Sequence, residues 1–306
     1  MTIAFISHPD CEKHDVGGAH PESPDRLRAI QDHLIATGLD MALRHYNAPK
    51  VSREDLLRVH DAAYVDEVFA RAPAEGIIWL DPDTGMMPAT LPAALRAAGA
   101  GVLGAELVMG GEAQQAFCSV RPPGHHAEHN RAMGFCLFNN IAVGVAHALE
   151  VCGLERVAIV DFDVHHGNGT EDIFRSNERV LLCSSFRHPY YPFTGSETGS
   201  NHIINAPLDV GSDGAVFRKM VEEKWLPALH AFKPQLMFIS AGFDAHAADD
   251  MGGLRLREAD YQWVTVEMKK IMLEYGEGRI VSMLEGGYDL GALARSVAAH
   301  LNGMLD

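Results

Sequence analysis

The sequence predicts an α/β protein in which helices cover both faces of a mainly parallel β-sheet. Apolar strand-like segments alternate with helix-like segments along most of the chain, and this alternation favours parallel strands joined by crossover helices. The run VAIV (157–160) is apolar on both faces, as a central parallel strand requires. Several strand-like segments end directly in carboxylates or histidines, and in open α/β sheets ligands bind at these carboxyl ends.

The N-terminal half opens with a short apolar strand at residues 3–7. Residues 24–37 are expected to form a helix, because Pro24 suits the start of a helix and Gly38 the position after its end. Small residues in the Ala-rich segment 90–109 suit a long helix that packs closely. The remaining elements of this half are a helix at 61–71 and a strand at 113–120.

The C-terminal half continues the same alternation. Short apolar runs predict strands, and longer segments with spaced apolar positions predict helices, the first of which ends at a glycine. The strands are expected at 157–160, 178–185, 235–242 and 278–287. The helices are expected at 138–153, 214–232, 260–276 and 290–304.

Length and composition indicate a soluble enzyme. With 306 residues, 47% of them hydrophobic, and no linker-like stretch, we expect one domain over residues 1–306. The net charge of −16 disfavours nucleic acid as a partner, and the lack of an 18-residue apolar run or a basic leader disfavours a membrane. The five scattered cysteines form no C-x-x-C, which suits the cytoplasm, where we expect the protein.

Polar residues follow four of the predicted strands. Asp161, Asp163 and His165 occupy alternate positions, so an extended backbone places them on one side. Two carboxylates and an imidazole that converge suit a cation, because buried like charges need neutralisation. A pair of aspartates that caps the next helix is the alternative interpretation. The other strand ends carry Asp244 with His246, His125 with His126, and Glu285 with Tyr288.

The adjacent histidines His125 and His126 follow a rigid Pro-Pro-Gly turn. On a strand, two neighbours point to opposite sides and do not easily bind one metal ion. In a loop they can flank one water molecule. The pair therefore indicates acid–base catalysis rather than metal binding.

Five motifs resemble, in the same order, those of the zinc-dependent histone deacetylase and acetylpolyamine amidohydrolase family. They are RPPGHHA, GFCLFNN, DFDVHHGNGTEDIF, SAGFDAHAADDMGGL and LEGGYDL. HPESPDRL (20–27) adds a signature of its class II-like and bacterial members. The resemblance spans residues 4–300 and implies a zinc-dependent deacetylase. It also implies the three-layer α/β/α arginase/deacetylase fold with a mainly parallel eight-stranded sheet.

The resemblance implies one catalytic zinc ion per chain, bound by Asp163, His165 and Asp244. Three protein ligands leave coordination open for water and a substrate carbonyl, as a catalytic site requires. The oxygen-rich set also suits iron(II). Arginase-like sites hold two metal ions with further carboxylates, but this chain has Gly167 and His246 at those positions, which supports a single metal.

The resemblance also implies catalytic roles. His126 would be the general base, and His125, held by Asp161, would assist electrostatically. Many family members orient the second histidine with an aspartate; this chain has Asn168, a neutral partner that should lower the pKa of that histidine. Tyr288 would donate its hydroxyl to the developing oxyanion, from a loop that two preceding glycines leave free to move.

Substrate-binding and potassium sites are implied in the same way. A tunnel around an alkyl chain would be lined by Gly134, Phe135, either Tyr191 or Phe193, Met251 and Gly287. A structural potassium ion would bind Asp161, Ser184 and backbone oxygens of Asp163 and His165. A second potassium ion would lie near Phe174 and Val180. Asp81 and Asp83 would form either a carboxylate at the tunnel rim or an ordinary turn.

Three functions are compatible with these residues. The first is a deacylase that acts on acyl-lysine side chains in proteins or peptides, the second an acetylpolyamine amidohydrolase that acts on small acetylated amines, and the third an inactive zinc-loaded binding module. Every position at which the family has a catalytic residue is filled in this chain, and this disfavours the third function. The apolar Met251, where polyamine-selective members place a glutamate, and the little room for a capping insertion favour the first. The natural substrate, acyl length, oligomeric state and metal used in the cell stay open.

Overall fold

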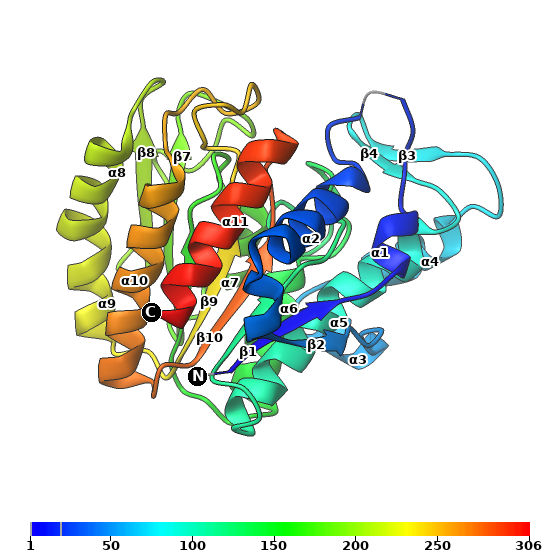
Figure 1. The fold of residues 1–306 in the computed structure, drawn as a ribbon. Helices are drawn as coiled ribbons and strands as arrows, with labels where there is room; N and C mark the ends of the chain where they lie inside the picture. The colour runs from blue at the N-terminus through cyan, green and yellow to red at the C-terminus, as the bar shows by residue number, and fades with distance from the viewer. Residues whose placement is uncertain (1, 19) are drawn as a thin grey trace.

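The computed structural model describes residues 2–18 and 20–306, and its centre is an eight-stranded sheet (Figure 1). The predicted fold class is confirmed, and every neighbouring pair of strands is parallel, in the order β2-β1-β5-β10-β9-β6-β7-β8. The strands are β1 (Ile3–Ser7), β2 (Leu43–Asn47), β5 (Gln115–Cys118), β6 (Val157–Asp161), β7 (Val180–Arg187), β8 (Ile203–Leu208), β9 (Leu236–Ala241) and β10 (Ile280–Leu284). A separate antiparallel hairpin joins β3 (Ile78–Asp81) and β4 (Thr84–Met86).

Helices cover both faces of the sheet and give three layers (Figure 1). On one face α11 (Leu290–Leu305) packs between α2 (Asp25–Thr37) and α10 (Glu258–Tyr275), whereas α5 (Thr90–Met109) and α6 (Asn140–Glu150) cover the other. The shorter helices are α1 (Asp10–Lys13), α3 (Arg53–Leu57), α4 (Ala62–Arg71), α7 (Asn168–Phe174), α8 (Gly214–Met220) and α9 (Leu226–Phe232). A 3₁₀ turn, η1 (Leu39–Ala42), follows α2, and a π-helical turn, η2 (Val221–Trp225), joins α8 to α9.

Among the described residues, α5 alone is long and apolar enough to cross a membrane, judged by length and composition. However, 67% of its most apolar window is buried inside the protein. A Cβ atom at Gly101 would lie 3.0 Å from the backbone oxygen of Asn140 on α6, and one at Gly104 would lie 2.8 Å from Val281 on β10. The small, apolar residues of α5 are therefore explained by close packing in the core.

The strands at the two edges of the sheet were not predicted from the sequence. In β2 only the first residue is buried, and β8 contains Pro207. An edge strand bonds to one neighbour only, so it tolerates polar residues and proline and leaves a weak apolar signal. The helix predicted at 214–232 consists of α8, η2 and α9 in direct succession.

The order of the central strands positions the polar residues found in the sequence. β5, β10, β9 and β6 are neighbours and all run in the same direction. The loops that follow them therefore start from one edge of the sheet, where the histidine pair, the Tyr288 loop and the aspartate-rich loops meet.

Candidate active site

Asp163, His165 and Asp244 form a buried cluster after β6 and β9. One potential ligand atom of each lies within 4.8 Å of those of the other two. His165 Nδ1 is 3.0 Å from Asp163 Oδ1 and 3.2 Å from Asp244 Oδ2. Asp244 Oδ2 is buried and lacks a hydrogen bond of good geometry within the described part of the chain. A divalent cation would satisfy this oxygen and balance both carboxylates, so the donor set fits a metal ion.

Backbone N–H groups orient both carboxylates. Asp163 accepts hydrogen bonds from His165 N (2.9 Å) and Gly286 N (2.8 Å), and Asp244 accepts one from Val164 N (2.9 Å). Burial and the adjacent Asp163 carboxylate raise the pKa of Asp244 to about 6. Two negative charges this close repel each other, so a cation between them is the natural counter-charge.

Asp161 lies beside this cluster and contacts a histidine of the tandem pair. Strand β6 ends at Asp161, so Asp163 and His165 belong to the following loop, and they converge there rather than on the strand itself. Asp161 Oδ2 is 3.0 Å from His125 Nδ1. Burial lowers the pKa of His125, but the carboxylates of Asp163 and Asp161 outweigh it and raise that pKa to about 10. These two carboxylates favour the protonated form of His125, which suits an electrostatic role.

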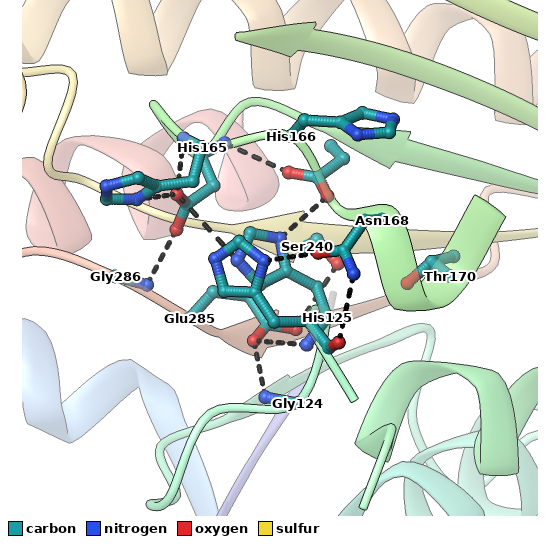
Figure 2. A network of polar contacts seen from close by, with 12 residues as sticks. Gly124, His125, His165, His166, Asn168, Thr170, Ser240, Glu285 and Gly286 are labelled. Carbon is teal, nitrogen blue, oxygen red and sulfur yellow. Dashed lines mark hydrogen bonds and ion pairs between the residues drawn. The ribbon is translucent and has the colours of Figure 1, made fainter. Parts of the chain in front are cut away.

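Glu285 anchors the loop of the histidine pair, a role that the sequence did not reveal. Its Oε2 accepts hydrogen bonds from Gly124 N (2.7 Å) and His125 N (3.2 Å), and its Oε1 accepts one from Ser240 Oγ (3.3 Å), as Figure 2 shows. Burial raises the pKa of Glu285 to about 7, although the charge of His125 opposes this. The signal was its position directly after the wholly buried strand β10.

Asn168 orients the ring of His126. Its Nδ1 lies 2.8 Å from Asn168 Oδ1, and Asn168 Nδ2 donates to Glu128 Oε1 at 2.9 Å. Because this assignment makes Oδ1 the acceptor, Nδ1 carries the hydrogen and Nε2 is free. Burial and the charge of His125 hold the pKa of His126 well below its usual value, whereas the Asn168 hydrogen bond opposes that shift. The low pKa thus has a different main cause from the neutral partner proposed from the sequence.

The side chains of Arg26 and Asp249 contact the backbone of the loop that carries Tyr288. Arg26 donates to the carbonyl oxygens of Gly287 (2.7 Å) and Glu285 (2.5 Å), and its guanidinium lies 5.1 Å from the centre of the Tyr288 ring. Asp249 accepts from the N–H of Tyr288 at 2.6 Å. Burial, with the nearby Asp244 carboxylate, raises the pKa of Tyr288 well above its usual value. The hydroxyl therefore keeps its proton and can donate it in a hydrogen bond.

The two glycines before Tyr288 serve close approach and backbone conformation. A Cβ atom at Gly286 would lie 2.1 Å from Asp244 Oδ2, so only glycine lets the loop reach the carboxylates. Gly287 has φ +121°, a value that side chains disfavour.

A cavity of about 250 Å³ extends between the exposed Phe193 and the buried His126 and His165. Its lining includes the predicted tunnel residues Gly134, Phe135, Tyr191, Phe193 and Met251, together with His126, His165, Tyr288, Asp83 and Tyr190. Tyr191 and Phe193, which the sequence left as alternatives, therefore both line it. A Cβ atom at Gly134 would lie 2.4 Å from the ring of His126. Gly287, predicted as a tunnel residue, lies outside the lining that the described residues form.

Tyr190 braces the metal cluster and the cavity, and sequence reasoning missed it. Its ring stacks on His165, with centroids 5.4 Å apart and an interplanar angle of 17°. Its hydroxyl donates to the backbone oxygen of Met251 at 2.5 Å, and the Arg187 guanidinium lies 4.0 Å from the ring centre. The only sequence signal was an aromatic pair, Tyr190 and Tyr191, between two prolines.

Gly167 and His246, which stand where arginase-like sites have carboxylates for a second metal, contribute no ligand to the described cluster. His246 Nδ1 accepts a hydrogen bond from Ala248 N at 3.0 Å, and its Nε2 lies 3.4 Å from Glu258 on α10. A Cβ atom at Gly167 would lie 2.5 Å from Asp161 Oδ2. Within the described ranges, the one group of potential metal ligands is the Asp163, His165 and Asp244 cluster.

The parallel sheet, the buried Asp-His-Asp cluster, the histidine pair and the tyrosine define the class of metal-dependent amidohydrolases. Residues 20–304 match the histone deacetylase domain family. The chain is 37% identical to the histone deacetylase-like amidohydrolase of Pseudomonas aeruginosa, over 88% of this chain and 72% of that protein. It is 34% identical to the type-2 histone deacetylase 2 of Dictyostelium discoideum, where all of this chain corresponds to 21% of that protein.

A crystal structure of the HDA15 HD domain has the same fold. The TM-score is 0.93 with 34% sequence identity, over 99% of this chain and 88% of that chain. The chain belongs to the histone deacetylase family, as its motifs predicted.

Proposed function

We propose that this protein hydrolyses the amide bond of acyl-lysine side chains in proteins or peptides. The observation that carries the proposal is the cavity, whose walls are mainly aromatic and apolar and whose inner end holds His126, His165 and Tyr288. Its volume of about 250 Å³ is below the ~300–1,000 Å³ of sites for drug-sized ligands. Such a space suits one extended acyl-lysine side chain whose amide lies at the inner end.

The residues at the inner end can share the steps of hydrolysis. A divalent ion such as zinc, or iron(II), held by Asp163, His165 and Asp244 would activate water and polarise the amide carbonyl. His126 Nε2 accepts the proton of the attacking water and passes it to the leaving amine. The Tyr288 hydroxyl donates to the oxygen on which negative charge develops. His125, held by Asp161, assists electrostatically as that charge develops.

Kinetics on two substrate sets test the proposal. One set consists of peptides with acetyl-lysine or longer acyl-lysines, and the other of monoacetylated putrescine, cadaverine and spermidine. We expect kcat/KM to be higher for acetyl-lysine peptides than for the acetylated diamines. A preference for acetylputrescine or acetylcadaverine would contradict it.

Hydrolysis of small acetylated amines is the second candidate, and Asp83 is the observation that favours it. Asp83 lines the cavity, so its carboxylate is available near a substrate that carries a second ammonium group. However, Asp83 Oδ1 already accepts a hydrogen bond from Gly134 N at 3.1 Å, and Asp81 Oδ1 accepts one from Asp83 N at 3.1 Å. The pair thus forms a turn that supports the cavity wall, and this use of the carboxylate favours acyl-lysine.

Replacing Met251 with glutamate is expected to shift kcat/KM toward acetylated diamines by ~10-fold or more. Met251 lines the cavity, and its backbone is fixed because Asp249 Oδ1 accepts from its N–H at 2.9 Å and Tyr190 donates to its oxygen. A carboxylate here would contribute about 1–3 kcal/mol to a distal ammonium, and 1.4 kcal/mol corresponds to tenfold. Parallel kinetics on an acetyl-lysine peptide and acetylcadaverine measure the ratio.

Met251→Gln is the matched control, because it has the same shape as the glutamate variant and no charge. Its ratio should stay within a few-fold of the wild type. An unchanged ratio in Met251→Glu, or an equal shift in both variants, would contradict a charge-based gate.

We also propose that potassium binds beside the active site, at Asp161 and Ser184. These residues are paired across β6 and β7, and both are buried. Ser184 Oγ has no hydrogen-bond partner among the described residues, and a cation could satisfy it. The second potassium site, near Phe174 and Val180, stays a prediction.

Replacing Ser184 with alanine is expected to abolish stabilisation by potassium. A ligand at 10–100 times its Kd stabilises a native protein by about 1.4–2.7 kcal/mol. Denaturation of the wild type in KCl, compared with N-methyl-D-glucamine chloride at equal ionic strength, should show this difference. Ser185→Ala, a buried neighbour whose side chain points to the other face, should keep it. If potassium stabilises the wild type and Ser184→Ala equally, Ser184 is not a ligand of the ion.

A further inference from the structure

Asp249 connects two walls of the cavity through a single carboxylate. Its Oδ1 accepts a hydrogen bond from Met251 N at 2.9 Å. Its Oδ2 accepts from Tyr288 N at 2.6 Å and from Asp289 N at 3.1 Å. Met251 and Tyr288 both line the cavity, although they are far apart in the sequence. The side chain of Asp249 thus links Met251 and Tyr288 directly through hydrogen bonds.

We propose that Asp249 is a positioning residue. It holds the Tyr288 hydroxyl within hydrogen-bonding distance of the reacting carbonyl and fixes the position of Tyr288 relative to Met251. This inference rests on the proposed amide hydrolysis. It assigns Asp249 no contact with substrate, because its carboxylate oxygens are engaged by three backbone N–H groups.

The chemistry of these contacts supports a positioning role. Asp249 is 5% exposed, and a buried carboxylate is costly unless charge-assisted hydrogen bonds compensate it. Three donors from two loops do so. On the opposite side, Arg26 holds the carbonyl oxygens of Gly287 and Glu285. The loop is therefore clamped by a cation on its carbonyl groups and by an anion on its N–H groups.

The clamp matters because an oxyanion donor works only within a narrow range of distances. Donors must lie about 2.7–3.1 Å from the oxygen that develops charge. Tyr288 extends from a loop that begins with two glycines, so the loop sequence alone does not fix the ring. Loss of the Asp249 contact would let the hydroxyl move while leaving Asp163, His165 and Asp244 in place.

A double-mutant cycle with Asp249→Asn and Tyr288→Phe tests this assignment. Asparagine keeps the size of Asp249, but its amide nitrogen cannot accept a hydrogen bond, so one loop loses its acceptor. Asp249→Asn should lower kcat by about 10-fold or more, with a smaller change in KM. In the Tyr288→Phe background, which lacks the hydroxyl, the same change should lower kcat by no more than about 2-fold. A trifluoroacetyl-lysine peptide, whose carbonyl is more electrophilic, keeps turnover of the slow variants measurable.

Asp250→Asn is the matched control, because Asp250 is the exposed neighbour in the same loop. It should leave kcat within about 2-fold of the wild type. Metal content should be equal in all variants. Equal losses of kcat from Asp249→Asn in the two backgrounds, no loss in the wild-type background, or loss of metal would each overturn the assignment.

Amide hydrogen exchange separates this inference from the proposed function. We expect residues 285–290 to exchange faster in Asp249→Asn than in Asp250→Asn, whatever the substrate. Unchanged exchange there would reject the clamp. If the wild type hydrolyses no acyl-lysine and no acetylated amine, the proposed function fails, and exchange still decides whether Asp249 orders the loop.

Discussion

Replacing His126 with alanine is expected to lower kcat by at least ~10²-fold on the best acetyl substrate, with metal content unchanged. General acid–base catalysis contributes about 10²–10⁴-fold, and His126 is the neutral imidazole that faces the cavity. Its tautomer is fixed by Asn168, which leaves Nε2 free. Its neighbour is not placed to take over, because His125 Nδ1 is engaged by Asp161 Oδ2 and His125 does not line the cavity that the described residues form. Steady-state kinetics and elemental analysis of the purified variant measure both quantities.

His129→Ala provides a control from the same loop. His129 is half-exposed and pairs with Asp172 at 2.5 Å, away from the cavity lining. Its loss should change kcat by less than about 2-fold. If His126→Ala keeps turnover near that of the wild type, another group is the base.

Removal of the metal is expected to lower kcat by roughly 10³-fold or more. One equivalent of zinc or iron(II) should restore it. Polarising a carbonyl and activating water contribute several kcal/mol, at 1.4 kcal/mol for each tenfold in rate. Asp244→Ala should abolish binding of this metal, because it removes one of three protein ligands and leaves Asp163 with His165 only. Elemental analysis should show one tightly bound ion per wild-type chain.

The His246→Ala variant distinguishes a single metal site from a pair of metal sites. His246 contacts Glu258 rather than the cluster, so the variant should still bind one ion. Two tightly bound transition-metal ions per active chain would show that the single-metal interpretation is wrong.

The sequence allowed prediction of those parts of the fold and site in which local pattern and chemistry agree. Strand β6 was evident because all five of its residues are buried and it leads into the metal-binding motif. The edge strands β2 and β8 were not evident, since exposure on one side leaves them partly polar. The resemblance supplied the number of strands that the local patterns lacked.

Within the site, short-range motifs were informative and long-range contacts were not. The ligand cluster and the histidine pair follow from short runs of residues in three motifs. Glu285, Arg26 and Asp249 act through backbone atoms of segments that lie 39–261 positions away in the chain. Any residue type can present a backbone N–H or carbonyl, so such contacts leave no pattern in the partner's sequence.

The glycine at 286 constrains how this active site could be redesigned. Its backbone joins the tyrosine loop to Asp163, and a Cβ there would meet Asp244 at 2.1 Å. A library that aims at bulkier acyl groups should therefore keep this position fixed, as if it were a metal ligand, although it contributes no ligand atom. Variation is better tolerated at the mouth, where Phe193 is 72% exposed. The chemistry is thus confined to the inner end of the cavity, where the packing allows little change, while substrate range can be altered at the entrance.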